Sequence, residues 1–481
     1  MTKLTHKSFS KTNLTISGLI ALFLSYLVLN KAFGSSFTHD EAFSYLFYIS
    51  TSFKKIITYS FPTANNHMLN SLMARLSLML FGNDEIFLRL PNVLAFIAYI
   101  TFFIRWINTQ TKNIFLIIFA FCFTFLNNEF FEFFSLCRGY GLSFLFIFLA
   151  LIQLNQSANS NRFLTQSKLF ITLTLMVLAN FSTLYIFLAM SFVYFLIQLK
   201  NGNSIWKSIL PPLFYSLGMI SFISLGLYRL ISNNQLYFGG DVSFFKDTFS
   251  SLIQGLLYGL KTPKALPFVF LAILLIMSYV TLIKTISQIK KNQPISKTGI
   301  FILVLGFTII LNIISHTIFG SKFLTHRTAL IYYPLLTLFV IQFSIDYIDP
   351  VLSNLKKNML FSLLAIPLTL VFTYTYSITD FKSWKFDSDT KQITHELNDL
   401  GQLKANQIRI GSDMYHQPSF NYYRVTNNYT LLDSVYKDSI PPNVNVIIWN
   451  GEFPKRLEGD FELKKIFKNS NSYLYLKKEL N

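Results

Sequence analysis

The sequence has few charged residues and almost no cysteine. Charged side chains make up 13% of the 481 residues, about half the share found in ordinary soluble domains. Its two cysteines, Cys122 and Cys137, are too few for a disulfide framework or a cysteine-rich metal site, and neither lies in a C-x-x-C pair. Most of the chain therefore cannot fold as ordinary soluble domains, and cysteine chemistry plays no visible part.

The residues that are abundant are apolar and aromatic. Hydrophobic residues make up 52% of the chain, with 53 Phe and 25 Tyr, and the mean hydropathy is +0.44. In a soluble protein the net charge of +18 would suggest nucleic acid, but this composition points to lipid. We therefore exclude a nucleic-acid partner and expect an all-α polytopic membrane protein that contacts membrane lipids.

About eleven apolar runs are long enough, or nearly so, to cross some 30 Å of hydrocarbon. They are Leu14–Phe33, Ile86–Trp106, Ile114–Phe131, Gly139–Leu154, Leu169–Asn180, Phe181–Leu199, Ile209–Leu230, Ala265–Ile283, Gly299–Phe319, Thr328–Phe343 and Met359–Tyr376. The fifth and sixth adjoin without a charged break, so they are either two short helices or one tilted span. The first is too long for a removable signal peptide and reads as a retained anchor.

The distribution of Lys and Arg predicts the orientation in the membrane. With the N-terminus inside, the cytoplasmic segments hold 15 basic and 2 acidic residues, and the outer loops hold 12 basic and 8 acidic. Basic residues accumulate in cytoplasmic loops. We therefore expect a plasma (inner) membrane protein with a cytoplasmic N-terminus, whose basic charge reports topology instead of a ligand site.

The chain changes character after Tyr376. Residues 1–378 form the predicted membrane domain, and 379–481 are polar and nearly neutral. A helical pattern covers Gln392–Leu400, and four short runs favour strands. These runs are Ile408–Ile410, Val444–Trp449, Phe461–Phe467 and Ser472–Lys477. We expect a small α/β domain outside the cytoplasm.

The first outer loop, 34–85, is far longer than a connection needs, and such loops are usually functional. Asp40 and Glu41 open a helical pattern that runs to about Tyr59. Thr38-x-x-Glu41 matches a capping box, so Glu41 either caps this helix or takes part in chemistry. Asp40 has no capping duty, although aspartate is also simply favoured in a first helical turn. It is the stronger catalytic candidate.

A second helical pattern in this loop starts near His67 and ends at Phe81-Gly82. It is amphipathic and covers roughly 22 Å, too short to span, so we expect it to lie in the membrane interface. His67 would stand at its start on the aqueous side. There it either donates a hydrogen bond to a phosphate or anchors the helix at the headgroups.

Two arginines are expected at the outer ends of spans, where charge is costly and tends to mark function. Arg138 stands at the mouth of the fourth span, with Glu129 and Glu132 as alternative salt-bridge partners. Arg327 stands at the outer end of the tenth span, where its alternative role is to reach the headgroups. No Asp-x-Asp follows the first span, and Asp387-Ser388-Asp389 begins the polar tail. We expect no metal and no cofactor.

In order and spacing these features resemble the GT-C superfamily of membrane glycosyltransferases. The resemblance rests on Asp40-Glu41 in the first outer loop, an interfacial helix ending in Phe81-Gly82, and Glu85-Ile-Phe-Leu-Arg89-Leu-Pro91. It is strongest to the branch that contains protein O-mannosyltransferases, lipid A aminoarabinose transferases and lipopolysaccharide-core glycosyltransferases. One departure is that the Lys-Pro-Pro of the aminoarabinose transferases is replaced by Asn66-His67-Met68.

The resemblance implies transfer of a sugar from a polyprenyl-phosphate donor to a hydroxyl of a lipid, glycan or protein acceptor on the outer face. It implies one inverting displacement with Asp40 as base, Glu41 as orienting group or cap, and His67, Arg138 and Arg327 at the donor phosphate. Two alternatives stay open. One is a transporter or lipid flippase, whose ionisable residues should lie near mid-membrane; the other is a non-catalytic lipid-binding subunit on the same scaffold.

Overall fold

The structure is a computed structural model that describes residues 10–158, 162–404, 407–413, 415–435, 444–450 and 459–478. In this part of the chain, nine helices are long and apolar enough to cross a membrane. They are α1 (Lys11–Gly34), α5 (Glu85–Gln110), α8 (Gly139–Ala158), α10 (Leu184–Lys200, extended by η2, Phe181–Thr183), α11 (Ile205–Ser232), α13 (Leu266–Lys290), α14 (Lys297–Phe319), α15 (Tyr332–Phe343, flanked by η4, His326–Ile331, and η5, Ser344–Ile348) and α16 (Asn354–Thr375). The predicted fold class, a polytopic α-helical membrane protein with a small sheet at its C-terminal end, is confirmed.

Two shorter apolar helices, α6 (Ile114–Phe125) and α9 (Phe163–Ala179), account for the other two of the eleven predicted spans. The fifth and sixth runs are separate helices. Asn180 between them is extended, with φ −156° and ψ 113°, and its side chain accepts a hydrogen bond from the backbone N–H of Ser182 at 3.1 Å. An extended residue that caps the following turn ends one helix and starts the next.

The loop between α1 and α5 contains several short helices. The predicted helix from Asp40 to about Tyr59 is broken into α2 (His39–Ser44), the π-helical turn η1 (Tyr45–Ile49) and α3 (Phe53–Ile57). The break falls where Ser52 caps α3 by accepting from the backbone N–H of Lys55, because a serine competes well for helix-start N–H groups. The second helix predicted in this loop is confirmed as α4 (Met68–Phe81), which ends at Gly82 with φ +98°.

The C-terminal residues form a four-stranded sheet with helices α17 (Thr390–Lys404) and α18 (Gln417–Thr426). The strands are β1 (Ile410–Ser412), β2 (Val446–Asn450), β3 (Phe461–Phe467) and β4 (Ser472–Lys477), in the order β1-β2-β4-β3. β1 pairs with β2 in parallel, and the other pairs are antiparallel. The strands β3 and β4 have the predicted bounds and pair as an antiparallel hairpin, whereas α18 was not predicted.

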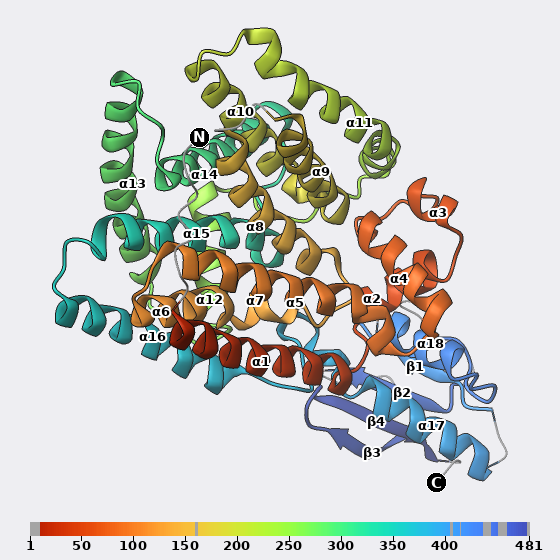
Figure 1. The fold of residues 1–481 in the computed structure, drawn as a ribbon. Coiled ribbons are helices and arrows are strands. Elements are labelled where there is room, and N and C mark those ends of the chain that lie inside the picture. Colours follow the sequence, from red (N-terminus) through yellow and green to blue (C-terminus); the bar gives the residue numbers. More distant parts are fainter. Residues whose placement is uncertain are drawn as a thin grey trace.

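The sheet and α17 lie at one end of the helical body, next to α2, α4 and α18 (Figure 1). Aromatic side chains join the two parts. Phe37, just before α2, stacks on Tyr422 of α18 with ring centroids 4.3 Å apart. The Tyr423 hydroxyl accepts from the N–H of Phe37 at 2.7 Å and donates to Glu85 at 2.9 Å. These contacts hold the start of α2 between α5 and the C-terminal residues.

Candidate active site

Asp40 lies in the first turn of α2 with its carboxylate directed at two arginines. Its Oδ2 is 3.0 Å from an Arg327 nitrogen and 3.5 Å from an Arg138 nitrogen. On the other oxygen, the side-chain amide of Asn65 donates at 3.5 Å. The two arginines precede α8 and α15 respectively, so three distant segments of the chain meet at this carboxylate.

Arg138 does not take either of the glutamates that the sequence offered. It is buried and contacts Asp40, the side-chain oxygen of Asn65 at 3.1 Å and the Ser44 hydroxyl at 3.5 Å. Glu129 is paired with Lys382 and Glu132 with Lys31 instead. The Nε of Arg138 has no hydrogen-bond partner among the residues that the structure describes, so this guanidinium has one N–H available to donate.

Arg327 is the more accessible of the two arginines, with 24% of its side chain exposed against 3% for Arg138. Its guanidinium lies between the rings of Phe238 and Trp384, 5.2 Å from each centroid. Such cation–π contacts fix the guanidinium plane and leave its edge available for hydrogen bonds. Arg327 is therefore held at the site and is not directed only to the headgroups.

Burial and nearby positive charge act in opposite directions on Asp40. Burial raises the pKa of its carboxyl group, but Arg138 and Arg327, with smaller contributions from His39 and Asn65, outweigh burial and lower the pKa to about 2. The carboxylate is therefore ionised throughout the neutral range while both cations hold it.

Glu41 points away from this cluster and is fully buried. Its two oxygens accept from Nε and Nη2 of Arg89 at 2.9 and 2.8 Å, which is a bidentate pair. Glu41 Oε2 also accepts from the backbone N–H of Thr38 at 2.9 Å, as the capping-box interpretation requires. A further donor is the backbone N–H of Cys137 at 2.6 Å. The contacts of Glu41 are those of a structural group.

Arg89 of α5 binds the loop that precedes α2, and it was not among the predicted site residues. Besides Glu41, it donates to the backbone carbonyls of Ala32 at 2.8 Å, Ser35 at 2.9 Å and Ser36 at 2.8 Å. These bonds fix the chain between the end of α1 and the start of α2. Arg89 thereby sets the position from which Asp40 reaches Arg138 and Arg327.

His67 is the N-cap residue of α4, and its side chain is buried inside the protein. Its Nδ1 lies 3.2 Å from the carbonyl oxygen of Ala179 and its ring is 5.1 Å from that of Tyr140. Burial and the charge of Arg138 lower the pKa of His67 well below its usual value. A neutral ring that donates from Nδ1 offers only a lone pair at Nε2, and within the described part of the chain that atom has no hydrogen-bond partner.

The residue before Asp40 is bound by the C-terminal residues. The backbone N–H of His39 donates to Asp387 at 2.6 Å, and its ring Nδ1 lies 2.7 Å from the Tyr415 carbonyl oxygen. Asp387 in turn accepts from Ser419 at 2.6 Å, and burial raises its pKa well above the usual value. Asp389 instead bonds with Ser470. Among the described residues, no three His, Cys, Asp or Glu side chains gather as metal ligands.

Sequence reasoning found three of the residues that meet at the site, namely Asp40, Arg138 and Arg327, and missed Asn65 and Trp384. Asn65 opens the Asn65-Asn66-His67 segment, where only the histidine drew attention. Trp384 is one of four tryptophans and lies seven residues after Ser377. A tryptophan in a polar segment just beyond the last span was the available signal.

Comparison with known proteins identifies the fold. No protein-family model and no curated protein matches this sequence. Two solved structures of ArnT from Cupriavidus metallidurans match in three dimensions. The one bound to undecaprenyl phosphate has a TM-score of 0.52 at 10% identity, over 96% of this chain and 97% of that one. The apo structure has a TM-score of 0.51 at 10% identity, over 96% and 98%. The chain thus has the fold of these ArnT structures.

Proposed function

From the ArnT fold of this chain, we propose that it is a membrane glycosyltransferase that uses a polyprenyl-phosphate-linked sugar. The sugar is transferred to an acceptor hydroxyl by a single inverting displacement. The observation that carries the proposal is the meeting of Asp40, Arg138 and Arg327. A carboxylate beside two arginines supplies a base and a phosphate-binding pair in one place.

The reaction needs few groups. The acceptor oxygen attacks the anomeric carbon on the face opposite the phosphate, and its proton passes to the Asp40 carboxylate. The bond from the anomeric carbon to the phosphate oxygen breaks, and its electron pair stays on the departing polyprenyl phosphate. Arg138 and Arg327 stabilise the negative charge that grows on this phosphate.

Donor binding also prepares the base. In the structure the arginines hold the pKa of Asp40 at about 2, far below the value at which a general base works well at neutral pH. A phosphate that takes one or both guanidinium groups removes these partners and adds a negative charge nearby. Both changes raise the pKa of Asp40, so the base becomes effective only when the donor is in place.

Glu41 and His67 take supporting parts in this proposal. Glu41 fixes the start of α2 through its hydrogen bonds to Thr38 and Arg89. It orients the acceptor indirectly, by holding Asp40 in position. His67 supports the floor of the site from Ala179, and donation from Nε2 to a phosphate requires the other tautomer or a second proton. The proposed orientation has the N-terminus in the cytoplasm and the site and C-terminal domain on the outer face of the inner membrane.

The test is release of polyprenyl phosphate by detergent-purified protein from a panel of polyprenyl-phosphate sugars, with membrane extract as acceptor. Turnover of one donor, lost in Asp40→Asn, supports the proposal and identifies the sugar. No turnover of any donor by folded protein, in an extract that serves a known transferase, would favour a transporter, a flippase or a non-catalytic lipid-binding subunit.

A further inference from the structure

Three partly exposed rings lie together beside the proposed base. They belong to His39 at the start of α2, Phe386 in η6 (Lys382–Asp387) and Tyr415 just before α18. The centroid of the Phe386 ring is 6.4 Å from that of His39, edge-on, and 5.1 Å from that of Tyr415. We propose that these rings form the acceptor site and that the acceptor group bound there is a sugar. This inference rests on the proposed function and deepens it.

The three rings adjoin both the base and the arginine that face each other in the site. His39 directly precedes Asp40, and its positive charge contributes to the lowered pKa of Asp40, so the two side chains are close. Phe386 comes two residues after Trp384, whose ring lies 5.2 Å from the guanidinium of Arg327. A molecule bound on the three rings can therefore present a hydroxyl group to the carboxylate of the base.

His39 is held so that one ring nitrogen remains for a ligand. Its backbone N–H donates to the buried Asp387 at 2.6 Å, and its Nδ1 lies 2.7 Å from the carbonyl oxygen of Tyr415. A carbonyl oxygen only accepts, so Nδ1 carries the ring proton and Nε2 of the neutral ring is an acceptor. No described residue donates to this Nε2. A sugar hydroxyl is a donor of the right kind.

The other two rings supply an apolar surface with a polar edge. Phe386 is half-buried and packs against the core of the helical body, which fixes its ring. Tyr415 is 47% exposed, and no described residue makes a hydrogen bond with its hydroxyl. A pyranose ring has a C–H face that packs on aromatic rings and a rim of hydroxyls that needs hydrogen-bond partners. A lipid chain would match the rings but leave these polar atoms unused.

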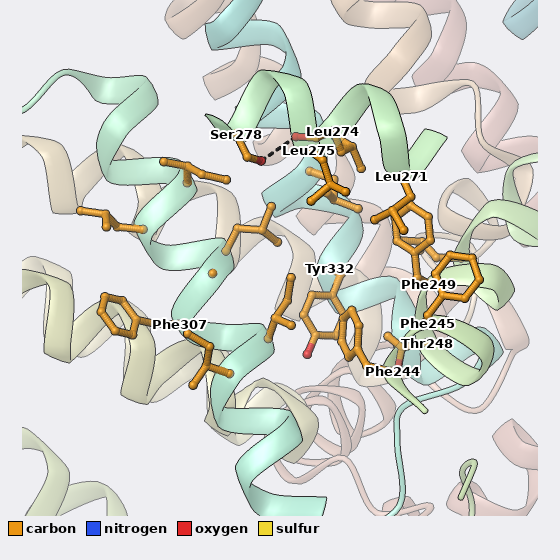
Figure 2. Close-up of a pocket in the computed structure, with 18 of the residues that line it drawn as sticks. Phe244, Phe245, Thr248, Phe249, Leu271, Leu274, Leu275, Ser278, Phe307 and Tyr332 are labelled. Carbon is orange, nitrogen blue, oxygen red and sulfur yellow. Dashed lines mark hydrogen bonds between the residues drawn. The ribbon is translucent and has the colours of Figure 1, made fainter. Parts of the chain in front are cut away.

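An apolar cavity in the membrane part is a much poorer place for a sugar. It has a volume of about 440 Å³ and lies between η3 (Phe244–Phe249) with α12 (Ser250–Leu256) and the helices α13, α14 and α15 (Figure 2). Of its 19 lining residues only three carry hydroxyls, and Ser278 donates its own to the Leu274 carbonyl at 2.6 Å, the bond drawn in Figure 2. Most hydroxyls of a sugar buried there would lack partners, which costs free energy.

Tyr473 offers a matched control for Tyr415. It is a partly exposed tyrosine of the same C-terminal domain, on β4. The preceding residue, Ser472, faces the helices, because its Oγ lies 3.3 Å from Nε2 of His416. Side chains alternate between the two faces of a strand, so Tyr473 lies on the opposite face of the sheet, away from His416 and Tyr415.

The experiment measures binding of water-soluble sugars to the purified full chain in detergent by saturation-transfer NMR. The probes are the methyl glycosides of glucose, galactose, mannose and N-acetylglucosamine. For at least one probe we expect Tyr415→Leu to weaken binding about tenfold, and Tyr415→Phe, which keeps the ring, to retain most of it. Equal affinities of Tyr415→Leu and Tyr473→Leu for every probe, or no binding of any probe by the wild type, would overturn the proposal.

His39→Asn tests the same site independently of Tyr415, and it replaces Tyr415→Leu if that variant does not fold. Its amide can still donate to the Tyr415 carbonyl, but it has no atom in the place of Nε2. We expect the same loss of sugar binding, about tenfold, with unchanged displacement of labelled undecaprenyl phosphate. Sugar binding at the wild-type level in His39→Asn would remove His39 from the site.

The product of transfer is the second arm. Membrane extract labelled from a radioactive donor is digested with protease and then fractionated. Label in an oligosaccharide supports the proposal, whereas label in peptides, or in a lipid that carries no other sugar, would overturn it. The binding arm needs no turnover. Sugar binding that is lost in Tyr415→Leu, without any transfer by the wild type, would support the site and reject the glycosyltransferase. Transfer that Asp40→Asn abolishes and Tyr415→Leu leaves unchanged would do the reverse.

Discussion

Arg138 and Arg327 both contact the same oxygen of Asp40, at 3.5 and 3.0 Å, although they are separated from it by 98 and 287 residues in the sequence. The carboxylate therefore occupies the place where two cations can bind an anion. A phosphate that enters must compete with Asp40 for these cations, so donor binding and the ionisation of Asp40 are coupled.

Asp40→Asn should abolish transfer without loss of donor binding. The amide cannot accept the acceptor proton as a base, and general-base catalysis contributes on the order of 10² to 10⁴ in rate. Because Asn no longer competes as an anion for Arg138 and Arg327, the affinity for undecaprenyl phosphate should stay equal or increase. Rate and affinity can be measured on the same purified sample. Transfer at the wild-type rate would remove Asp40 from the mechanism.

Arg327→Gln should weaken binding of polyprenyl phosphates by on the order of tenfold or more, because one of two charge-assisted partners of the phosphate is lost. Lys322→Gln is the matched control, since Lys322 is a nearby cation that pairs with Asp241. Displacement binding at low and high salt would compare them. A similar loss of affinity in both variants would indicate that the positive charge of this region attracts the phosphate nonspecifically, without a binding site at Arg327.

The contribution of Asp40 to stability should disappear in acid. The pKa of Asp40 is lowered from 3.8 to about 2 in the folded protein, so its ion pairs stabilise the fold above about pH 4. This contribution is lost as the pH falls from about 4 towards 2. We expect wild type to unfold at a higher temperature than Asp40→Asn from pH 8 to 5, and the gap to narrow below pH 4. A gap that closes near neutral pH would contradict this assignment.

Donor binding should shift the pH dependence of the reaction. Free enzyme keeps Asp40 ionised down to about pH 2, so kcat/KM for the donor should show no acid limb from Asp40 near neutral pH. In the donor complex the arginines are engaged by phosphate, and the acid limb of kcat should lie at higher pH. Steady-state rates between pH 4 and 9 test this, and identical limbs in both profiles would refute the exchange of partners.

Glu41→Gln should lower stability more than it lowers the rate per folded molecule. It leaves the fully buried Arg89 without its counter-charge, and breaking one partner of a buried pair costs about 3–5 kcal/mol. The double variant with Arg89→Gln should recover part of this loss in thermal unfolding. A variant with wild-type stability and no turnover would instead make Glu41 a catalytic group.

Local features were predicted well from the sequence because short-range patterns determine them. The apolar periodicity before Gly82 predicted α4, and the runs Phe461–Phe467 and Ser472–Lys477 predicted the strands β3 and β4. The single helix expected from Asp40 to Tyr59 was wrong because Ser52 caps a new helix within it. The helix α18 was missed because its amphipathic face is covered by distant residues such as Phe37.

The sequence alone determined that this is a polytopic membrane protein and where its spans lie. It also identified Asp40, Glu41, Arg138 and Arg327 as candidate site residues. The length of an apolar run and the free-energy cost of placing a charge in the membrane both depend on the local sequence. They can therefore be assessed segment by segment along the chain. Only the tertiary structure decided which of these residues meet. It placed Asp40 against both arginines, paired Glu41 with Arg89 and buried His67 beside Ala179. Ion pairs between residues far apart in sequence depend on helix packing, which no local pattern specifies.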